Sequence, residues 1–158
     1  MTDYLGLCLA LERTAPTQYR NYNFNSMAKV GDVYLGANEN GIFILDSGDS
    51  DAGDEIEAFF ELPTSDWGII NAKRIRRLYV SYESNGDLLL SVKDDEDNLR
   101  YYLLEPVHLP NKQHTARVAI GRDGKGVHWM IRIENTSGSD FSVDRINIIP
   151  VVLGKKPR

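Results

Sequence analysis

The stretch Gly121–Pro150 gathers residue types that could carry chemistry, since a lysine lies between glycines, a histidine precedes a tryptophan, and aspartates follow. A phosphate-binding loop requires a Ser or Thr after its lysine and a helix that follows, and neither is present here. We therefore predict a turn, in which glycines display Arg122, Asp123 and Lys125 at an exposed tip. The sequence argues against a nucleotide site at this position.

Two acidic runs are the next candidates, because hard cations such as Ca²⁺ prefer several oxygen ligands. The run from Asp46 to Glu55 offers a candidate calcium site made of Asp46, Asp49, Asp51 and Asp54. It lacks the twelve-residue spacing and the terminal glutamate of an EF-hand, and a solvated acidic turn is the alternative. The second run, Asp94–Asn98, is predicted to be a solvated hairpin tip.

Catalytic side chains do not form a recognisable set. The three histidines are scattered, and His128 is predicted to lie on the opposite face of its strand from Trp129. No serine lies in a nucleophile elbow, and Cys8 lies in an apolar stretch where a structural role is the default. We expect a protein that is not an enzyme and that needs no cofactor.

Composition suits one domain with a sizeable core, since the chain has 158 residues of which 42% are hydrophobic. A formal net charge of −5 argues against nucleic-acid binding, which needs a clustered excess of Lys and Arg. A single cysteine permits neither an internal disulfide nor a cysteine-based zinc site. We read no secretion signal and no membrane span at the start of the chain.

Apolar and polar residues alternate with a period of two through most of the chain, which predicts strands. The clearest strand is Val127–Glu134. After a turn at Asn135–Gly138, Phe141, Val143 and Ile146–Leu153 are predicted to form strands that return from it as a hairpin. Asn85-Gly86 predicts a tight hairpin, and Asn38–Gly41 predicts another. Pro150 indicates an edge strand or a break.

These features predict an all-β protein, an antiparallel β-sandwich of the jelly-roll or immunoglobulin-like type. The predicted core residues are Trp129, Ile131, Phe141 and Val143. We expect residues 1–16 to form an N-terminal helix or arm and residues 17–158 to form a single sandwich domain. In the arm, docking on a neighbouring subunit is predicted for Leu5, Leu7, Leu9 and Leu11. A helix that covers the sheet, or a strand that pairs with another subunit, would show the same pattern.

A basic cluster, Lys73-Arg74 and Arg76-Arg77, precedes a tyrosine-containing strand. Alternation predicts that its charges are divided between two faces, and we expect local ion pairs or a subunit contact in preference to nucleic-acid recognition. Tyr79, Tyr82, Tyr101 and Tyr102 raise the alternative of a sugar-stacking platform.

Several fragments, in order, resemble small β-rich virion proteins of tailed bacteriophages, especially proteins of the tail and its tip. The fragments are NYNFNSM, VYLGANENGIFILD, DEIEAFFEL, KRIRRLYVSYESNGDLLLSV and KGVHWMIRIENTSGSDFSVDRINIIPVVL. The resemblance covers Asn21–Leu153. It implies a structural signature without active-site residues, and Asp123 replaces the glycine that is more usual in such proteins.

The resemblance implies a structural subunit of a phage tail, tail tip or baseplate that acts by association with other virion proteins. A homo-oligomeric ring is the expected assembly, made in the host cytoplasm and carried in the virion. A receptor- or carbohydrate-binding sandwich module that uses calcium is the alternative function.

Overall fold

A computed structural model of the chain describes residues 4–10, 15–20, 22–45, 47–48, 50–51, 53–106, 112–122 and 124–154. All strand pairs are antiparallel and the described residues contain no helix, so the all-β prediction is confirmed. Within this part of the chain no helix is therefore long and apolar enough to cross a membrane. The chain divides into two compact units, Met1–Gly48 and Asp49–Arg158.

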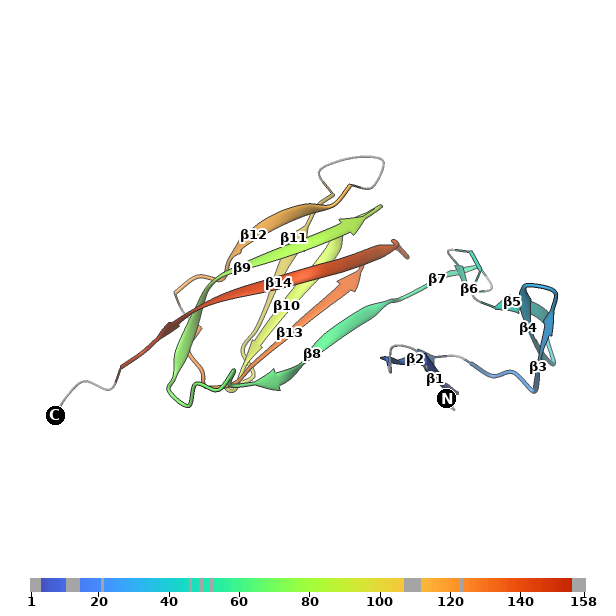
Figure 1. The fold of residues 1–158 in the computed structure, drawn as a ribbon, viewed down its shortest axis with the longest axis horizontal. Coiled ribbons are helices and arrows are strands. Elements are labelled where there is room, and N and C mark those ends of the chain that lie inside the picture. Colours follow the sequence, from blue (N-terminus) through green and yellow to red (C-terminus); the bar gives the residue numbers. More distant parts are fainter. Residues whose placement is uncertain are drawn as a thin grey trace. The chain divides into compact units, whose positions relative to one another are not determined.

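The second unit contains two larger sheets, whose strands can be followed in Figure 1. One has the strand order β11-β10-β13-β8 and the other the order β12-β9-β14. The bounds are β8 Phe59–Ser65, β9 Lys73–Ser84, β10 Leu88–Asp94, β11 Leu99–Leu104, β12 His114–Ala119, β13 Trp129–Asn135 and β14 Phe141–Val152. A short pair, β6 (Ser50–Asp51) and β7 (Asp54–Glu55), precedes them.

One hydrophobic core joins the two larger sheets, since its buried residues come from β9 and β12 on one side and from β10, β11 and β13 on the other. Trp129 and Ile131 are fully buried there, as alternation in β13 requires. Phe141 and Val143 are half-buried and pack against the same core. The arrangement is that of an antiparallel β-sandwich.

The predicted hairpin at Asn85-Gly86 is wrong, because β9 and β10 belong to different sheets. A type I′ turn needs positive φ at both central residues, and neither residue has it. Gly86 is needed for a different reason, since a Cβ there would overlap the Ser139 side chain. The segment therefore carries the chain across the sandwich instead of back along the same sheet.

The turn after β13 also carries the chain from one sheet of the sandwich to the other. β13 pairs with β10 and β8, whereas β14 pairs with β9, so the return of Phe141–Leu153 beside the Trp129 strand is wrong. β14 is an edge strand, and Pro150 lies on it at a β-bulge, as its missing N–H predicts. Opposite Pro150 the bulge gives β9 one extra residue, Arg76, between Ile75 and Arg77.

The first unit consists of a hairpin and a three-stranded meander. The hairpin pairs β1 (Leu5–Ala10) with β2 (Ala15–Arg20), and the meander has the order β3-β4-β5. The meander strands are β3 Ser26–Val30, β4 Val33–Asn38 and β5 Gly41–Leu45, and the predicted hairpin at Asn38–Gly41 is confirmed.

The helix alternative for the N-terminal segment is wrong, since residues 5–10 are a strand that pairs within its own chain. The division after Gly48 also differs from the predicted boundary at residue 16, because residues 15–20 form the second strand of the hairpin. Leu5, Leu7 and Leu9 are spaced two residues apart, and in a strand this spacing places their side chains on the same face.

Candidate functional site

The glycine-rich loop before β13 is held against the sandwich. The backbone of Lys73 exchanges two hydrogen bonds with Gly126, with N···O distances of 2.8 and 3.1 Å. A Cβ at Gly124 would lie 2.8 Å from Cη2 of Trp129, and one at Gly126 would overlap the Asp95 carboxylate. These two glycines are thus required for close approach to neighbours, whereas Gly121, at a φ of 84°, serves the turn.

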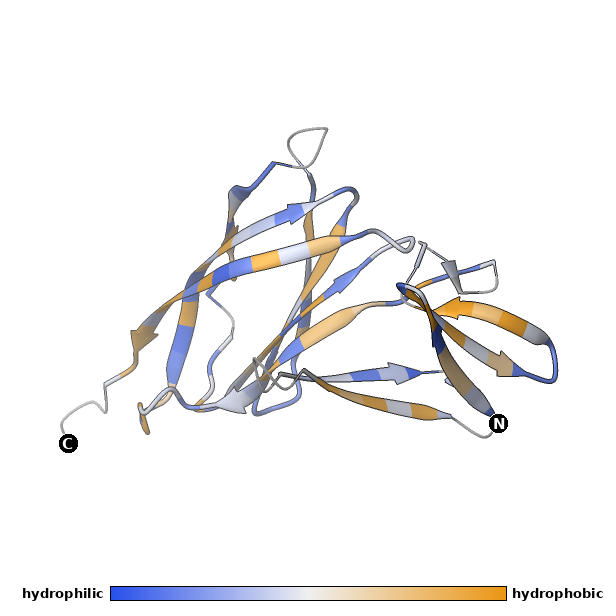
Figure 2. Cartoon of the chain, turned by 45° about the vertical axis from the view of Figure 1, so that its right-hand side comes forward, coloured by the Kyte–Doolittle hydropathy of each residue, from blue (hydrophilic) through white to orange (hydrophobic). Residues whose placement is uncertain are grey.

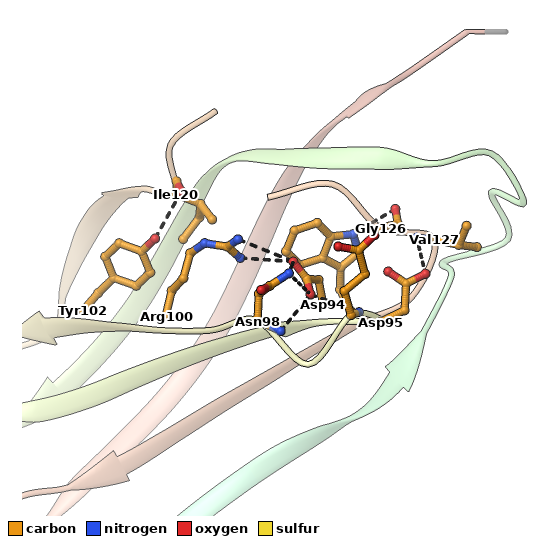
Figure 3. A network of polar contacts seen from close by, with 10 residues as sticks. Asp94, Asp95, Asn98, Arg100, Tyr102, Ile120, Gly126 and Val127 are labelled. Atoms are coloured by element: carbon orange, nitrogen blue, oxygen red, sulfur yellow. Dashed lines mark hydrogen bonds and ion pairs between the residues drawn. The ribbon is translucent and has the colours of Figure 1, made fainter. Parts of the chain in front are cut away.

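The Asp94 carboxylate organises the β10–β11 hairpin from inside the protein (Figure 3). It accepts hydrogen bonds from the backbone N–H groups of Glu96 and Asn98, at 3.1 and 3.0 Å, and from the Asn98 side chain. Arg100 forms an ion pair with it at 3.4 Å. The prediction of a solvated hairpin tip is correct for the hairpin and wrong for Asp94.

Asp95, the next residue, reaches the loop itself. Its carboxylate accepts a hydrogen bond from the Val127 N–H at 2.9 Å (Figure 3). That backbone hydrogen bond is the main reason why the pKa of Asp95 lies below its ordinary value of 3.8. A further backbone hydrogen bond from His128 and the His128 charge lower the pKa of Asp95 in the same direction.

This lowered pKa gives a prediction for Asp95→Asn. A carboxyl whose pKa is depressed on folding stabilises the protein above the unfolded value and loses that contribution as the pH falls through the folded value. The variant should therefore be less stable than the wild type at pH 7, by less than about 1 kcal/mol because solvent screens the exposed carboxylate. The difference should shrink near about pH 3.

Urea unfolding at both pH values measures the effect of Asp95→Asn. Glu96→Gln, a neutralisation in the same turn, is the matched control and should show no such dependence. An Asp95→Asn difference that stays constant at acid pH would contradict the assigned interaction.

Lys73, the first member of the basic cluster, is fully buried. Its Nζ donates hydrogen bonds to the carbonyl oxygens of Ile69, at 2.9 Å, and Val127, and lies 5.7 Å from the centre of the Trp67 ring. Lys73 therefore acts inside the sandwich, while Arg74 and Arg77 lie on its outer face.

His128 lies in a surface depression of about 390 Å³ beside the β10–β11 turn. The lining residues are Glu61, Thr64, Lys93, Asp94, Asp95, Asp97, His128 and Met130. Sequence reasoning placed His128 on an exposed face but did not bring it beside the acidic turn. Lys93 and Asp97 form an ion pair of 2.6 Å, and Asp95 holds the loop backbone, so several lining groups already have partners.

Of the four candidate calcium ligands, only Asp54 has a side chain that the structure describes. Asp46 and Asp49 lie outside the described residues, as does the side chain of Asp51, and Asp54 is exposed on β7. The described residues contain no group of three or more His, Cys, Asp or Glu side chains that could hold a metal ion. Calcium binding by this loop stays a prediction.

The four tyrosines do not form one platform. Tyr82 is buried and donates to the Glu105 carbonyl oxygen at 2.8 Å; burial first, and then the Asp87 and Glu105 carboxylates, raise its pKa to about 12. Tyr102 donates to the Ile120 carbonyl oxygen at 3.2 Å. Tyr79 and Tyr101 belong to opposite sheets, so the four tyrosines do not share one face, and sugar binding stays a prediction.

The N-terminal hairpin exposes the predicted leucines. Leu5, Leu7 and Leu9 lie on one face of β1, and Leu7 is 77% exposed. The opposite face approaches Tyr22, whose ring lies 2.7 Å from a Cβ built on Gly6. Leu11 lies outside the described residues.

Aromatic side chains cover one face of the meander, and the other face consists mainly of exposed aliphatic side chains. Phe24 lies over Gly36, where a Cβ would come within 2.7 Å of its ring, and Phe24 also contacts Phe43 at a ring separation of 5.9 Å. Strand register places a different set of side chains on the other face. We call this set the aliphatic face: Ala28, Val30, Val33, Leu35, Ala37, Ile42 and Ile44.

Figure 2 shows hydrophobic residues running along the strands of the meander. On the aliphatic face Ile42 is 75% exposed, Val30 63% and Ile44 60%. The described residues of this unit bury no large hydrophobic side chain, in contrast with the second unit. Sequence reasoning missed this face, although the aliphatic residues at every second position of β4 (Val33, Leu35 and Ala37) signal it.

Comparison of the chain with protein-family models, with curated proteins and with solved structures found no match. The fold and these surfaces define an all-β protein with a packed sandwich unit and an exposed aliphatic sheet face.

Proposed function

We propose that the chain is a structural subunit of a bacteriophage tail or tail-tip assembly and acts through protein–protein association. The observation that supports association most directly is the aliphatic face. A three-stranded sheet needs its hydrophobic face covered to be stable, and an exposed aliphatic surface of this kind is typical of an interaction site. The virion assignment is supported by the order of the sequence fragments that resemble phage tail proteins.

Localisation tests the virion assignment. Purified particles labelled with an antibody to this chain are expected to carry label at repeated positions on the tail, and electron microscopy would show it. Absence of the chain from purified, infectious particles would remove the proposal.

Ile42→Asp tests the role of the aliphatic face. Burying an isoleucine contributes about 1.5–3 kcal/mol, so a charge at this position should weaken association at least about 10-fold. Ile70→Asp is the matched control, because Ile70 is 83% exposed in the connection between β8 and β9 of the other unit. Sedimentation equilibrium gives both association constants, and equal values would show that the aliphatic face takes no part.

A further inference from the structure

The outer face of the sheet β12-β9-β14 collects arginines from all three strands. Tyr79 on β9 lies between Arg117 of β12 and Asn147 of β14, and Ser81 lies beside Arg145. Arg77 pairs with Ile149, and Arg74 pairs with Val151. We call this set, Arg74, Arg77, Arg117 and Arg145, the arginine face.

The bulge at Arg76 creates this grouping. In an unbroken strand Arg74 and Arg77 would point to opposite faces, because they are three residues apart. The extra residue reverses the alternation, so that Ile75 and Leu78 both point into the core while Arg74 and Arg77 both point outward.

No ion pair between described residues neutralises the arginine face. Among the described residues, none of its four guanidinium groups is in an ion pair, and the Nε of Arg74 is buried without a hydrogen-bond acceptor. Two acidic residues, Glu83 and Asp144, lie next to Arg145 at one end of the face, and Asp144 accepts a hydrogen bond from Gln113. Arg74, Arg77 and Arg117 have no acidic residue as a cross-strand partner. A group of like charges on one face of a sheet favours an anionic ligand.

The composition of the face favours a protein ligand over a nucleic acid. Exposed Ile149 and Val151 share its rows with Arg77 and Arg74. Arginine mixed with tyrosine and aliphatic side chains is typical of protein interfaces, from which lysine is depleted. The net charge of −5 also opposes the long-range attraction of a polyanion.

The second unit also carries an exposed acidic segment, whose charge is opposite to that of the arginine face. Asp54, Glu55, Ile56 and Glu57 are consecutive and exposed. None of these three carboxylates forms an ion pair within the described part of the chain. Arginine binds carboxylates through paired hydrogen bonds, and Ile56 offers an apolar side chain that could contact Ile149 and Val151.

We propose that Asp54–Glu57 of one copy docks on the arginine face of a second copy. This inference rests on the proposed function and specifies one of its contacts. The two patches differ, so the contact is head-to-tail and each copy uses both. Such a contact produces a ring when the rotation closes and a filament when it does not.

Charge reversal tests the contact in the full-length protein. Arg77→Glu with Arg117→Glu, and separately Glu55→Arg with Glu57→Arg, should each weaken self-association at least about 10-fold at an ionic strength of about 0.15 M. The four changes combined in one chain should restore association, because opposite charges face each other again. Lys93→Glu with Lys125→Glu, away from both patches, makes the same change of net charge as the arginine reversal and should have no effect.

Sedimentation velocity measures these states, and circular dichroism checks folding. If the double arginine variant unfolds, Arg145→Glu on the edge strand makes the same comparison. Wild-type association that survives both reversals, or is not restored in the combined variant, would overturn the contact and leave the proposed function standing. A monomeric wild type that is absent from particles would overturn both.

Nucleic acid is the competing ligand. If the wild type bound a single-stranded DNA oligonucleotide, lost that binding on reversal of the arginine face, and associated normally after reversal of Glu55 and Glu57, the face would belong to nucleic acid. That result would overturn the proposed docking.

Discussion

Replacement of Trp129 by alanine is expected to lower the free energy of unfolding by about 3–5 kcal/mol. Trp129 is the largest fully buried side chain of the described residues and belongs to the core that joins the two sheets of the sandwich. Its Nε1 donates to the Gly126 carbonyl oxygen at 3.3 Å, and its ring lies against Gly124. Truncation therefore leaves a cavity and releases the loop that the ring supports.

Urea denaturation of the full-length chain, followed by circular dichroism, measures this loss. Trp67→Ala is the matched control, because Trp67 is only half-buried at the margin of the same core. It should lose less stability than Trp129→Ala. A loss below about 1 kcal/mol at Trp129 would be that of an average substitution and would contradict its central position.

The second large effect is expected for Asp94→Ala, at about 2–4 kcal/mol. The change removes the acceptor for two backbone N–H groups of the β10–β11 turn and for the Asn98 side chain. It also leaves Arg100 without its ion-pair partner. Unsatisfied donors and an unpaired charge near the core are costly, although partial exposure of Arg100 limits the loss.

Glu96→Ala provides the comparison within the same turn. Its side chain is exposed, so its replacement should change stability by no more than about 0.5 kcal/mol. Thermal unfolding and urea denaturation give both values. Equal effects at Asp94 and Glu96 would mean that the buried network does not hold the turn.

The two units differ in how they are stabilised. The second unit buries a continuous core of its own. In the first unit, the described residues form a series of aromatic contacts from Tyr22 through Phe24 to Phe43 and leave the aliphatic face exposed. Association that covers the aliphatic face would add to the stability of the first unit by mass action. Its unfolding transition should then depend on protein concentration more than that of the sandwich.

The sequence by itself determined the main strands of the sandwich and which of their side chains share a face. Alternation around Trp129 predicted the buried face of β13, and the position of Pro150 predicted an edge. These features are local, since a period of two assigns each side chain to a face whatever the neighbouring strand is.

Only the tertiary structure decided which strands pair and which residues meet. The same alternation is satisfied when two consecutive strands lie side by side or face each other across the core, so Asn85-Gly86 did not distinguish a hairpin from a crossing. The burial of Asp94, the approach of His128 to the acidic turn and the arginine face all depend on long-range pairing. The arginine face depends in addition on one inserted residue, Arg76, because a single bulge reverses the direction of every side chain that follows it.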